Sequence, residues 1–232
     1  MWPVVLDSWL AWNVQFEAYI PYMYLDDAKP DVGGPFVTTA VGILIDPVGM
    51  AVGLPWVHKD GTPATSAEIQ MEWHRVKAMT AYSRFGGGSD FFSKSAQLHL
   101  SADGIKQAVM RKLVLNEQIL SQAFKGWATY PAPAQMAIGS MAWSMGAGFW
   151  VKFPIFSGHV TARNWGACAG LPGDASANPA LRGSSWEMNN HLPGPNPANR
   201  GIHPRNLANR RLFFQAAAVE LGHLDPSTLD LG

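Results

Sequence analysis

Residues 16–42 read FEAYIPYMYLDDAKPDVGGPFVTTAVG, and this stretch decides how the chain begins to fold. An apolar segment carries Glu17 near its end, and Asp26 follows nine residues later, after a run of aromatic residues. The residues Gly33-Gly34-Pro35 are typical of a turn, and the β-branched residues after them favour a strand. The stretch therefore predicts a helix end, a turn and a hairpin, with two carboxylates before the hairpin.

Two carboxyl groups in different surroundings are what acid/base cleavage of a glycosidic bond requires. Aromatic and aliphatic neighbours favour a protonated Glu17, which suits a general acid. Asp26 lies in a polar stretch and suits an ionised general base, although Asp27 beside it is an alternative. A threonine hydroxyl on the following strand can orient a water molecule, and either Thr38 or Thr39 could supply it. We therefore expect the active centre of a glycan-cleaving enzyme.

Composition indicates a folded protein with a sizeable core, because 47% of the 232 residues are hydrophobic and 15% are charged. No run of apolar residues is long enough for a membrane helix, which needs about 18. A single cysteine, Cys168, excludes an internal disulfide and a cysteine-based metal site. We interpret Cys168 as a small buried residue and not as a nucleophile.

Charge is distributed unevenly along a chain of zero net charge. Residues 1–72 hold two basic and nine acidic side chains, and residues 73–232 hold the remaining 15 basic and 8 acidic ones. A basic region suits an anionic polymer such as the bacterial cell wall. The arginines of this region do not require nucleic acid as a partner, and a surface dipole without any binding role is the alternative interpretation.

Hydrophobic periodicity and capping signals predict the first half of the chain. A helix capped by Asp7 or Ser8 should run to about Ala18, so that Glu17 lies on its last turn before Pro21. Residues 31–56 predict an antiparallel hairpin or small sheet that includes the stretch from Val48 to Leu54. The remaining expectations here are a helix that begins at a Thr65 capping box and ends near Tyr82, and a flexible loop at 84–94.

The second half predicts helices of a different kind. Ser101 should cap a long helix to about Phe124, and residues 134–145 read as a buried helix that stops at Gly146. A short helix is expected around 162–169 and a last helix at 206–221, and between them 171–203 form an extended loop rich in Pro, Gly and Asn. The fold class is therefore α+β, mostly helical with a small antiparallel sheet lobe and a long connecting helix.

The chain resembles the phage-type lysozymes, which are the muramidases of glycoside hydrolase family twenty-four. Their signature is a Glu that ends the first helix, an aromatic-x-Asp nine residues later, and Thr-x-x-x-Gly in the next hairpin. Glu17, Tyr24-Leu25-Asp26 and Thr38-Thr39-Ala40-Val41-Gly42 carry this pattern. The segments 137–146 and 206–212 also resemble the central helix of the family and its Leu-x-x-Arg-Arg motif. The spacing from Asp to Thr is longer here, and Ile43 stands where many members have His.

The resemblance implies a single lysozyme-like domain over 1–232. Its parts would be a helix and hairpin lobe at 1–63, connecting helices at 64–125 and a helical lobe at 126–232. It also implies that Glu17 acts as the acid, Asp26 as the base and Thr38 as the residue that holds water, with inversion at the sugar. Family members often pair the catalytic Glu with an arginine of the last helix, for which the candidates are Arg210, Arg211 and Arg205.

Two other functions remain open from the sequence: a lytic transglycosylase, which needs the Glu but not Asp26, and a cell-wall-binding module without activity. No cofactor and no metal are expected, because the seven histidines include no His-x-x-x-His pair. The expected partner is the glycan strand of peptidoglycan, bound by a monomer, without nucleic acid. Residues 1–7 lack the basic start of a signal peptide. We therefore expect action in the periplasm or at the cell wall after delivery by a holin or a secretion system. An immunity protein is a further candidate partner.

Overall fold

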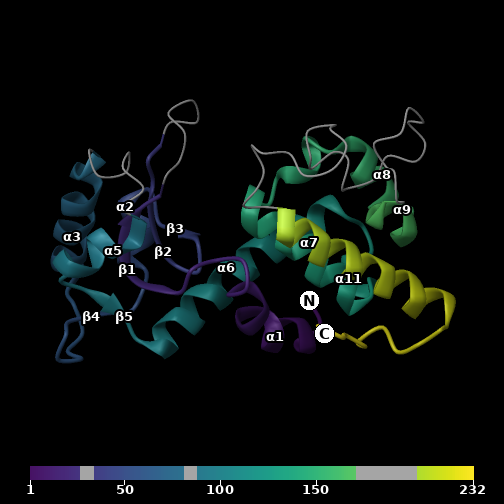
Figure 1. Cartoon of the computed structure of the whole chain (residues 1–232), viewed down its shortest axis with the longest axis horizontal. Coiled ribbons are helices and arrows are strands. Elements are labelled where there is room, and N and C mark those ends of the chain that lie inside the picture. The colour runs from purple at the N-terminus through teal and green to yellow at the C-terminus, as the bar shows by residue number, and fades with distance from the viewer. Residues whose placement is uncertain (27–33, 81–87, 171–202) are drawn as a thin grey trace. The chain divides into compact units, whose positions relative to one another are not determined.

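The computed structural model describes residues 1–26, 34–80, 88–170 and 203–232 (Figure 1). It combines helices with a small antiparallel sheet, so the expected α+β class is confirmed. Contacts divide the chain into two compact units, one made of Met1–Phe16 with Leu113–Gly232 and the other of Glu17–Lys112. The first helix thus groups with the C-terminal part of the chain, whereas the sequence analysis grouped it with the hairpin.

The first unit begins with helix α1, Pro3–Asn13, which starts earlier and ends earlier than predicted. Trp2 is extended and Pro3 occupies the first helical position, where proline costs no hydrogen bond, so the helix needs no cap at Asp7 or Ser8. Trp9 is fully buried and packs on helix α7, Ala132–Met145. A β-carbon on Gly139 of α7 would lie 3.0 Å from the Trp9 ring, so the glycine allows this close approach.

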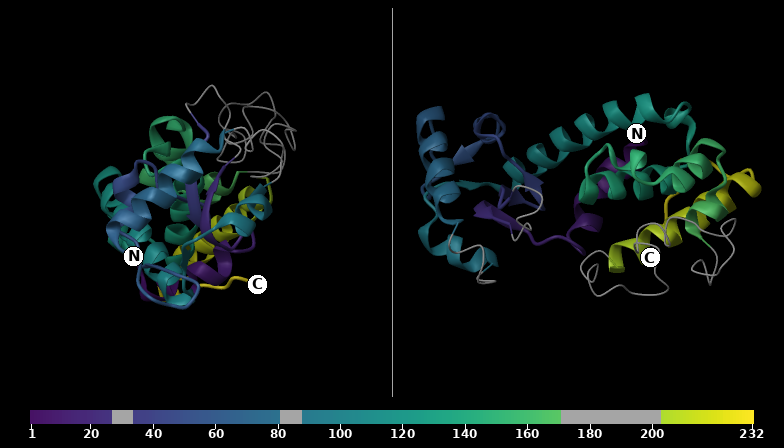
Figure 2. Two further views of the ribbon diagram at one scale, coloured as in Figure 1. Left: turned by 90° about the vertical axis from the view of Figure 1, so that its left-hand side faces the viewer. Right: turned by 90° about the horizontal axis from the view of Figure 1, so that it is seen from above.

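Helix α7 forms the buried centre of this unit, as the apolar pattern predicted, and it ends at Gly146. The final helix α11, His203–Leu221, begins three residues before the predicted start and lies beside α7 (Figure 2). The short helix expected at 162–169 is α9, Trp165–Ala169, and α8, Pro154–Thr161, precedes it as a helix that was not predicted. Arg163, at φ 54°, makes the turn between them. The described part of the unit also contains the one-turn 3₁₀ segments η2, Trp127–Thr129, and η3, Phe149–Val151.

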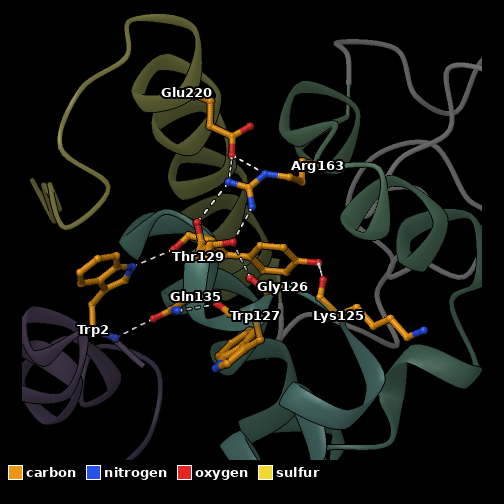
Figure 3. A network of polar contacts seen from close by, with 9 residues as sticks. Trp2, Lys125, Gly126, Trp127, Thr129, Gln135, Arg163 and Glu220 are labelled. Atoms are coloured by element: carbon orange, nitrogen blue, oxygen red, sulfur yellow. Dashed lines mark hydrogen bonds and ion pairs between the residues drawn. The ribbon is translucent and has the colours of Figure 1, made fainter.

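A network of polar contacts joins the ends of these helices (Figure 3). The backbone N–H of Trp2 donates to Oε1 of Gln135 at 2.7 Å, which ties the start of α1 to α7. Arg163 donates through Nε to Oε1 of Glu220 at 2.7 Å and through Nη1 to Oγ1 of Thr129 at 3.0 Å. These bonds connect the α8–α9 turn, η2 and α11, so the unit is held by side chains that are distant in sequence.

The second unit contains a three-stranded antiparallel sheet in the order β1-β2-β3, at Ile20–Leu25, Val37–Ala40 and Ile43–Leu44. The small antiparallel sheet expected within 31–56 is confirmed by β2 and β3, but β1 was not predicted as a strand. The stretch from Val48 to Leu54 was wrongly predicted as strand, because Val48–Val52 forms the short helix α2. Pro47 suits a helix start, and only Ala51 of α2 is buried, so the segment lacks the alternating burial of a strand.

Helix α3, Ser66–Ala78, begins at the predicted capping box, where Thr65 and Glu68 exchange hydrogen bonds. It ends before Tyr82, and residues 81–87 lie outside the described ranges. The loop expected at 84–94 is wrong in its second part, because Gly88–Ser95 forms helix α5, anchored by the buried Phe92. The sequence predicted a loop here because the glycine run of this segment is typical of loops and disfavours a helix.

Helix α6, Ala102–Ala123, agrees with the predicted long helix, and the Ser101 hydroxyl accepts a hydrogen bond from the Gly104 N–H at 3.0 Å. Its residues are divided between the two units. A two-stranded sheet, β4 at Trp56–Val57 and β5 at His99–Leu100, was not predicted, because two-residue strands carry no periodicity.

Within the described ranges, none of the helices has both the length and the apolar character of a membrane span. The extended loop predicted at 171–203 lies outside the described residues, apart from residue 203.

Candidate functional site

Glu17 is the first residue of the second unit and lies in a bend, four residues after α1 has ended at Asn13. The prediction that it occupies the last turn of the helix is therefore wrong. The Glu17 side chain is half-buried and its carboxylate lies against Gly42, at the turn between β2 and β3. A β-carbon on Gly42 would stand 2.8 Å from Oε2 of Glu17, and the backbone of Gly42 has φ +75°. Both the contact and the conformation therefore favour glycine.

Asp26 follows directly after β1 and is held by the backbone of Phe36. The Asp26 N–H donates to the Phe36 carbonyl at 3.1 Å, and the Phe36 N–H donates to Oδ1 of Asp26 at 2.8 Å. These two bonds fix both the backbone and the carboxylate of Asp26 at the end of the sheet. Asp27, the alternative base, lies outside the described residues.

Tyr24 connects the two carboxylates electrostatically. Burial raises the pKa of the Tyr24 phenol, and the negative charges of Glu17 and Asp26 raise this pKa further. Each carboxylate has this effect because it would repel an ionised phenol. Glu17 and Asp26, which belong to the same unit, therefore act on the same phenol.

The strand register places the side chains of Thr38 and Thr39 on opposite faces of the sheet. Thr38 is directly opposite Tyr24 on β1 and Leu44 on β3, so these three side chains share one face of the sheet. Thr39 is opposite Ile43 and points to the other face, where it is fully buried. The Thr39 hydroxyl finds no hydrogen-bond partner among the described residues, whereas Oγ1 of Thr38 donates to the Phe36 carbonyl at 3.4 Å.

Lys112 of α6 is a cation near Glu17 that the sequence analysis did not identify. Burial lowers the pKa of Lys112, and the Glu17 carboxylate acts in the opposite direction by favouring the charged ammonium. The two residues belong to the same unit and carry opposite charges. One lysine on a long helix with several charged residues has no distinguishing pattern in the sequence, so only the folded chain reveals it.

The three candidate arginines lie in α11, in the first unit, and have different surroundings. Arg205 is 2% exposed and donates through Nη1 to Oδ1 of Asn13 at 2.9 Å and to Oγ of Ser140 at 3.3 Å. Its guanidinium also lies over the Phe16 ring, 4.9 Å from the ring centre. Arg210 donates to the Gly170 carbonyl at 3.0 Å, and Arg211 is exposed. Arg205 is thus the one that contacts the segment leading to Glu17.

Cys168 is fully buried, and burial raises the pKa of its thiol, which agrees with its interpretation as a packing residue. Across the described ranges, no group of three or more His, Cys, Asp or Glu side chains is arranged to hold a metal ion.

The candidate site consists of Glu17, Tyr24, Asp26, Thr38 and Lys112, supported by Phe36 and Gly42. This chain matches no protein-family model, no curated protein and no solved structure.

Proposed function

We propose that this chain is a peptidoglycan hydrolase with a lysozyme-like architecture, which cleaves the β-1,4 bond between N-acetylmuramic acid and N-acetylglucosamine. The observation that carries the proposal is that one small sheet holds both carboxylates: Glu17 lies against Gly42 at the turn after β2, and Asp26 is bonded to the Phe36 backbone just before β2. The charges of both also raise the pKa of the Tyr24 phenol. Acid/base hydrolysis of a glycoside requires two carboxyl groups in unlike surroundings, one to donate a proton and one to accept a proton. The motif spacing that resembles the muramidases adds to this geometric support.

Glu17 acts as the general acid in this proposal and gives its proton to the leaving glycosidic oxygen. Its half-buried position against Gly42 limits its freedom to a narrow range of orientations. Lys112 is the counter-charge that stabilises the Glu17 carboxylate once the proton has left. A positive charge in a half-buried place has a larger effect on such a step than one in water.

Asp26 acts as the general base and takes a proton from the attacking water, which the Thr38 hydroxyl helps to hold. The N–H of Phe36 donates to Oδ1 of Asp26 and so orients the carboxylate that would take the proton. Inversion requires the two carboxyl groups to be about 6.5–9.5 Å apart, so that water fits between base and sugar.

The surface around these residues has the mixed character that sugars require. Leu44, which shares the face of Thr38 and Tyr24, is 38% exposed, and Tyr19, two residues after Glu17, is 48% exposed. A sugar ring has an apolar face and a polar edge, so apolar side chains beside carboxylates suit it. We therefore assign the glycan strand to this face of the sheet.

The setting that we propose is the bacterial cell wall, where the chain acts as a phage endolysin or as a secreted antibacterial effector. A holin or a secretion machine would deliver it, and an immunity protein would protect the producer in the second case. These proposals rest on the activity and stand only if the activity is found.

Digestion of purified peptidoglycan by the wild type and by Glu17→Gln tests the activity. We expect soluble muropeptides with hydrated reducing ends from the wild type and a loss of about 10²–10⁴ in rate for the variant. Glu68→Gln is the matched control, because Glu68 belongs to an exposed capping box in which glutamine also serves. Wild-type rates for Glu17→Gln would overturn the proposal, and 1,6-anhydro products would assign a lytic transglycosylase instead.

A further inference from the structure

A clamp built from Lys77 of α3 and Asp46 holds the backbone segment 35–37. The Lys77 ammonium donates to Oδ2 of Asp46 at 2.5 Å and to the Pro35 carbonyl at 2.9 Å. The same carboxylate oxygen of Asp46 accepts the Val37 N–H at 3.2 Å. One ion pair thus fixes the residue before Phe36 and the residue after it.

The Phe36 side chain is part of the same clamp. The Lys77 ammonium lies 5.4 Å from the centre of the Phe36 ring and 5.8 Å from that of Trp73, which is within the range of a cation–π contact. The Trp73 indole in turn donates to the Ile45 carbonyl at 2.9 Å, next to Asp46. The side chains of Lys77 and Asp46 are 33% and 14% exposed, so the pair is partly shielded from water and its geometry is better defined than that of a surface pair.

The clamped segment is the one that orients Asp26. Two hydrogen bonds join Asp26 to the Phe36 backbone, through its N–H and its carbonyl, and the Thr38 hydroxyl donates to that same carbonyl. A shift of Phe36 would therefore move the Asp26 carboxylate and release the Thr38 hydroxyl at once. Neither Lys77 nor Asp46 takes part in the proposed chemistry.

We infer that Lys77 and Asp46 are positioning residues for the Asp26 carboxylate and act on it through the Phe36 backbone. The inference rests on the proposed function for its kinetic consequence, but the clamp itself can be measured without any activity. Displacement of a catalytic group by about 1 Å can cost on the order of 10²-fold in rate. Loss of the clamp should therefore lower kcat and leave the binding of the glycan nearly unchanged.

The test compares Lys77→Met with two other variants. We expect Lys77→Met to lower kcat at least about 10-fold with KM changed less than about 3-fold, and Lys77→Arg to keep most of kcat because its guanidinium can still bind Asp46. Lys106→Met is the matched control, since Lys106 pairs with Asp103 at 3.5 Å on the exposed surface of α6, whereas Asp46 and Pro35 are bound by Lys77. Wild-type kcat in Lys77→Met would overturn the inference.

Amide hydrogen exchange at Phe36 provides the readout that needs no activity. The Phe36 N–H is bonded to Asp26, so its exchange should accelerate at least about 10-fold in Lys77→Met and stay unchanged in Lys106→Met. Equal exchange rates in these two variants would overturn the clamp. Accelerated exchange in a protein whose wild type cleaves no glycan would instead support the clamp and overturn the proposed function. If Lys77→Met does not fold, Asp46→Asn, which keeps the shape and removes the charge, takes its place in both measurements.

Discussion

The carboxylate of Glu17 lies against the α-carbon of Gly42, with Oε2 2.8 Å from the place where a β-carbon would stand. This relationship connects a residue four positions after the first helix with a hairpin turn 25 positions later in the chain. It means that the hairpin does more than carry the threonines, because its turn also sets where the proposed acid can lie.

Replacement of Gly42 by alanine should displace the Glu17 carboxylate. The new methyl group collides with Oε2, and the positive φ adds about 1–2 kcal/mol of backbone strain. We expect the rate of peptidoglycan cleavage to fall on the order of 10²-fold. Gly61→Ala is the control, because Gly61 has φ +86° and open space around it, so it carries the strain without the collision. Equal rates for both variants would show that the Gly42 contact has no functional role.

The two threonines should respond in opposite ways to replacement by valine. Thr39→Val removes a buried hydroxyl that has no hydrogen-bond partner in the described part of the chain, so the free energy of unfolding should rise by about 1 kcal/mol. Thr38→Val removes the hydroxyl beside the Phe36 carbonyl and should lower kcat without raising stability. Urea unfolding and muropeptide release on the same two samples measure both effects, and a kcat loss confined to Thr39→Val would reverse the assignment.

Local signals in the sequence were sufficient to predict the helices whose ends carry prolines, glycines or capping residues. The helix at 132–145 has prolines at its start, glycine at its end and apolar residues between, so burial all round could be predicted. The Thr65 capping box and the Ser101 cap were recognised for the same reason, since each depends on contacts within one turn. Carboxylates and hydroxyls near the hairpin could likewise be proposed as a group.

Contacts between distant residues could not be predicted. α1 ends at Asn13, and this side chain is held by Arg205, 192 positions away in the sequence. Lys77 and Lys112 look like ordinary lysines of amphipathic helices, because nothing in their local pattern reveals a partner at Asp46 or Glu17. The choice between Thr38 and Thr39 depended on strand register, which a shift of one residue would reverse.

The raised pKa of the Tyr24 phenol predicts how stability depends on pH. The unfolded state ionises tyrosine near its ordinary pKa of about 10, while the folded state keeps Tyr24 neutral to higher pH. The folded state therefore binds more protons above that value, and the free energy of unfolding falls as pH rises further. Tyr24→Phe should make this fall shallower. Burial also raises the pKa of Cys168, but this contribution is the same in both proteins and cancels in the comparison.

Glu17→Gln should lower the pKa of Tyr24 towards its ordinary value, because one of the two nearby negative charges is removed. The same variant should lower the pKa of Lys112 further, since Glu17 is the charge that favours its ammonium form. Nuclear magnetic resonance titration of labelled tyrosine and lysine side chains measures both, with Glu68→Gln as the exposed control. Unchanged titrations would mean that Glu17 lies away from both groups.

Arg205 and Arg211 should differ sharply when each is replaced by methionine. Arg205 is buried, and its loss leaves Asn13 and Ser140 without the hydrogen bonds that it donates, so we expect a destabilisation on the order of 2 kcal/mol. Arg211 is exposed on the same helix, and its replacement should change the free energy of unfolding by less than about 0.5 kcal/mol. Urea unfolding measures both values. Because Arg205 also lies over the Phe16 ring, next to Glu17 in the chain, its loss should reduce cleavage more than its stability effect alone explains. A rate that recovers fully at a temperature where the variant is folded would limit Arg205 to a structural role.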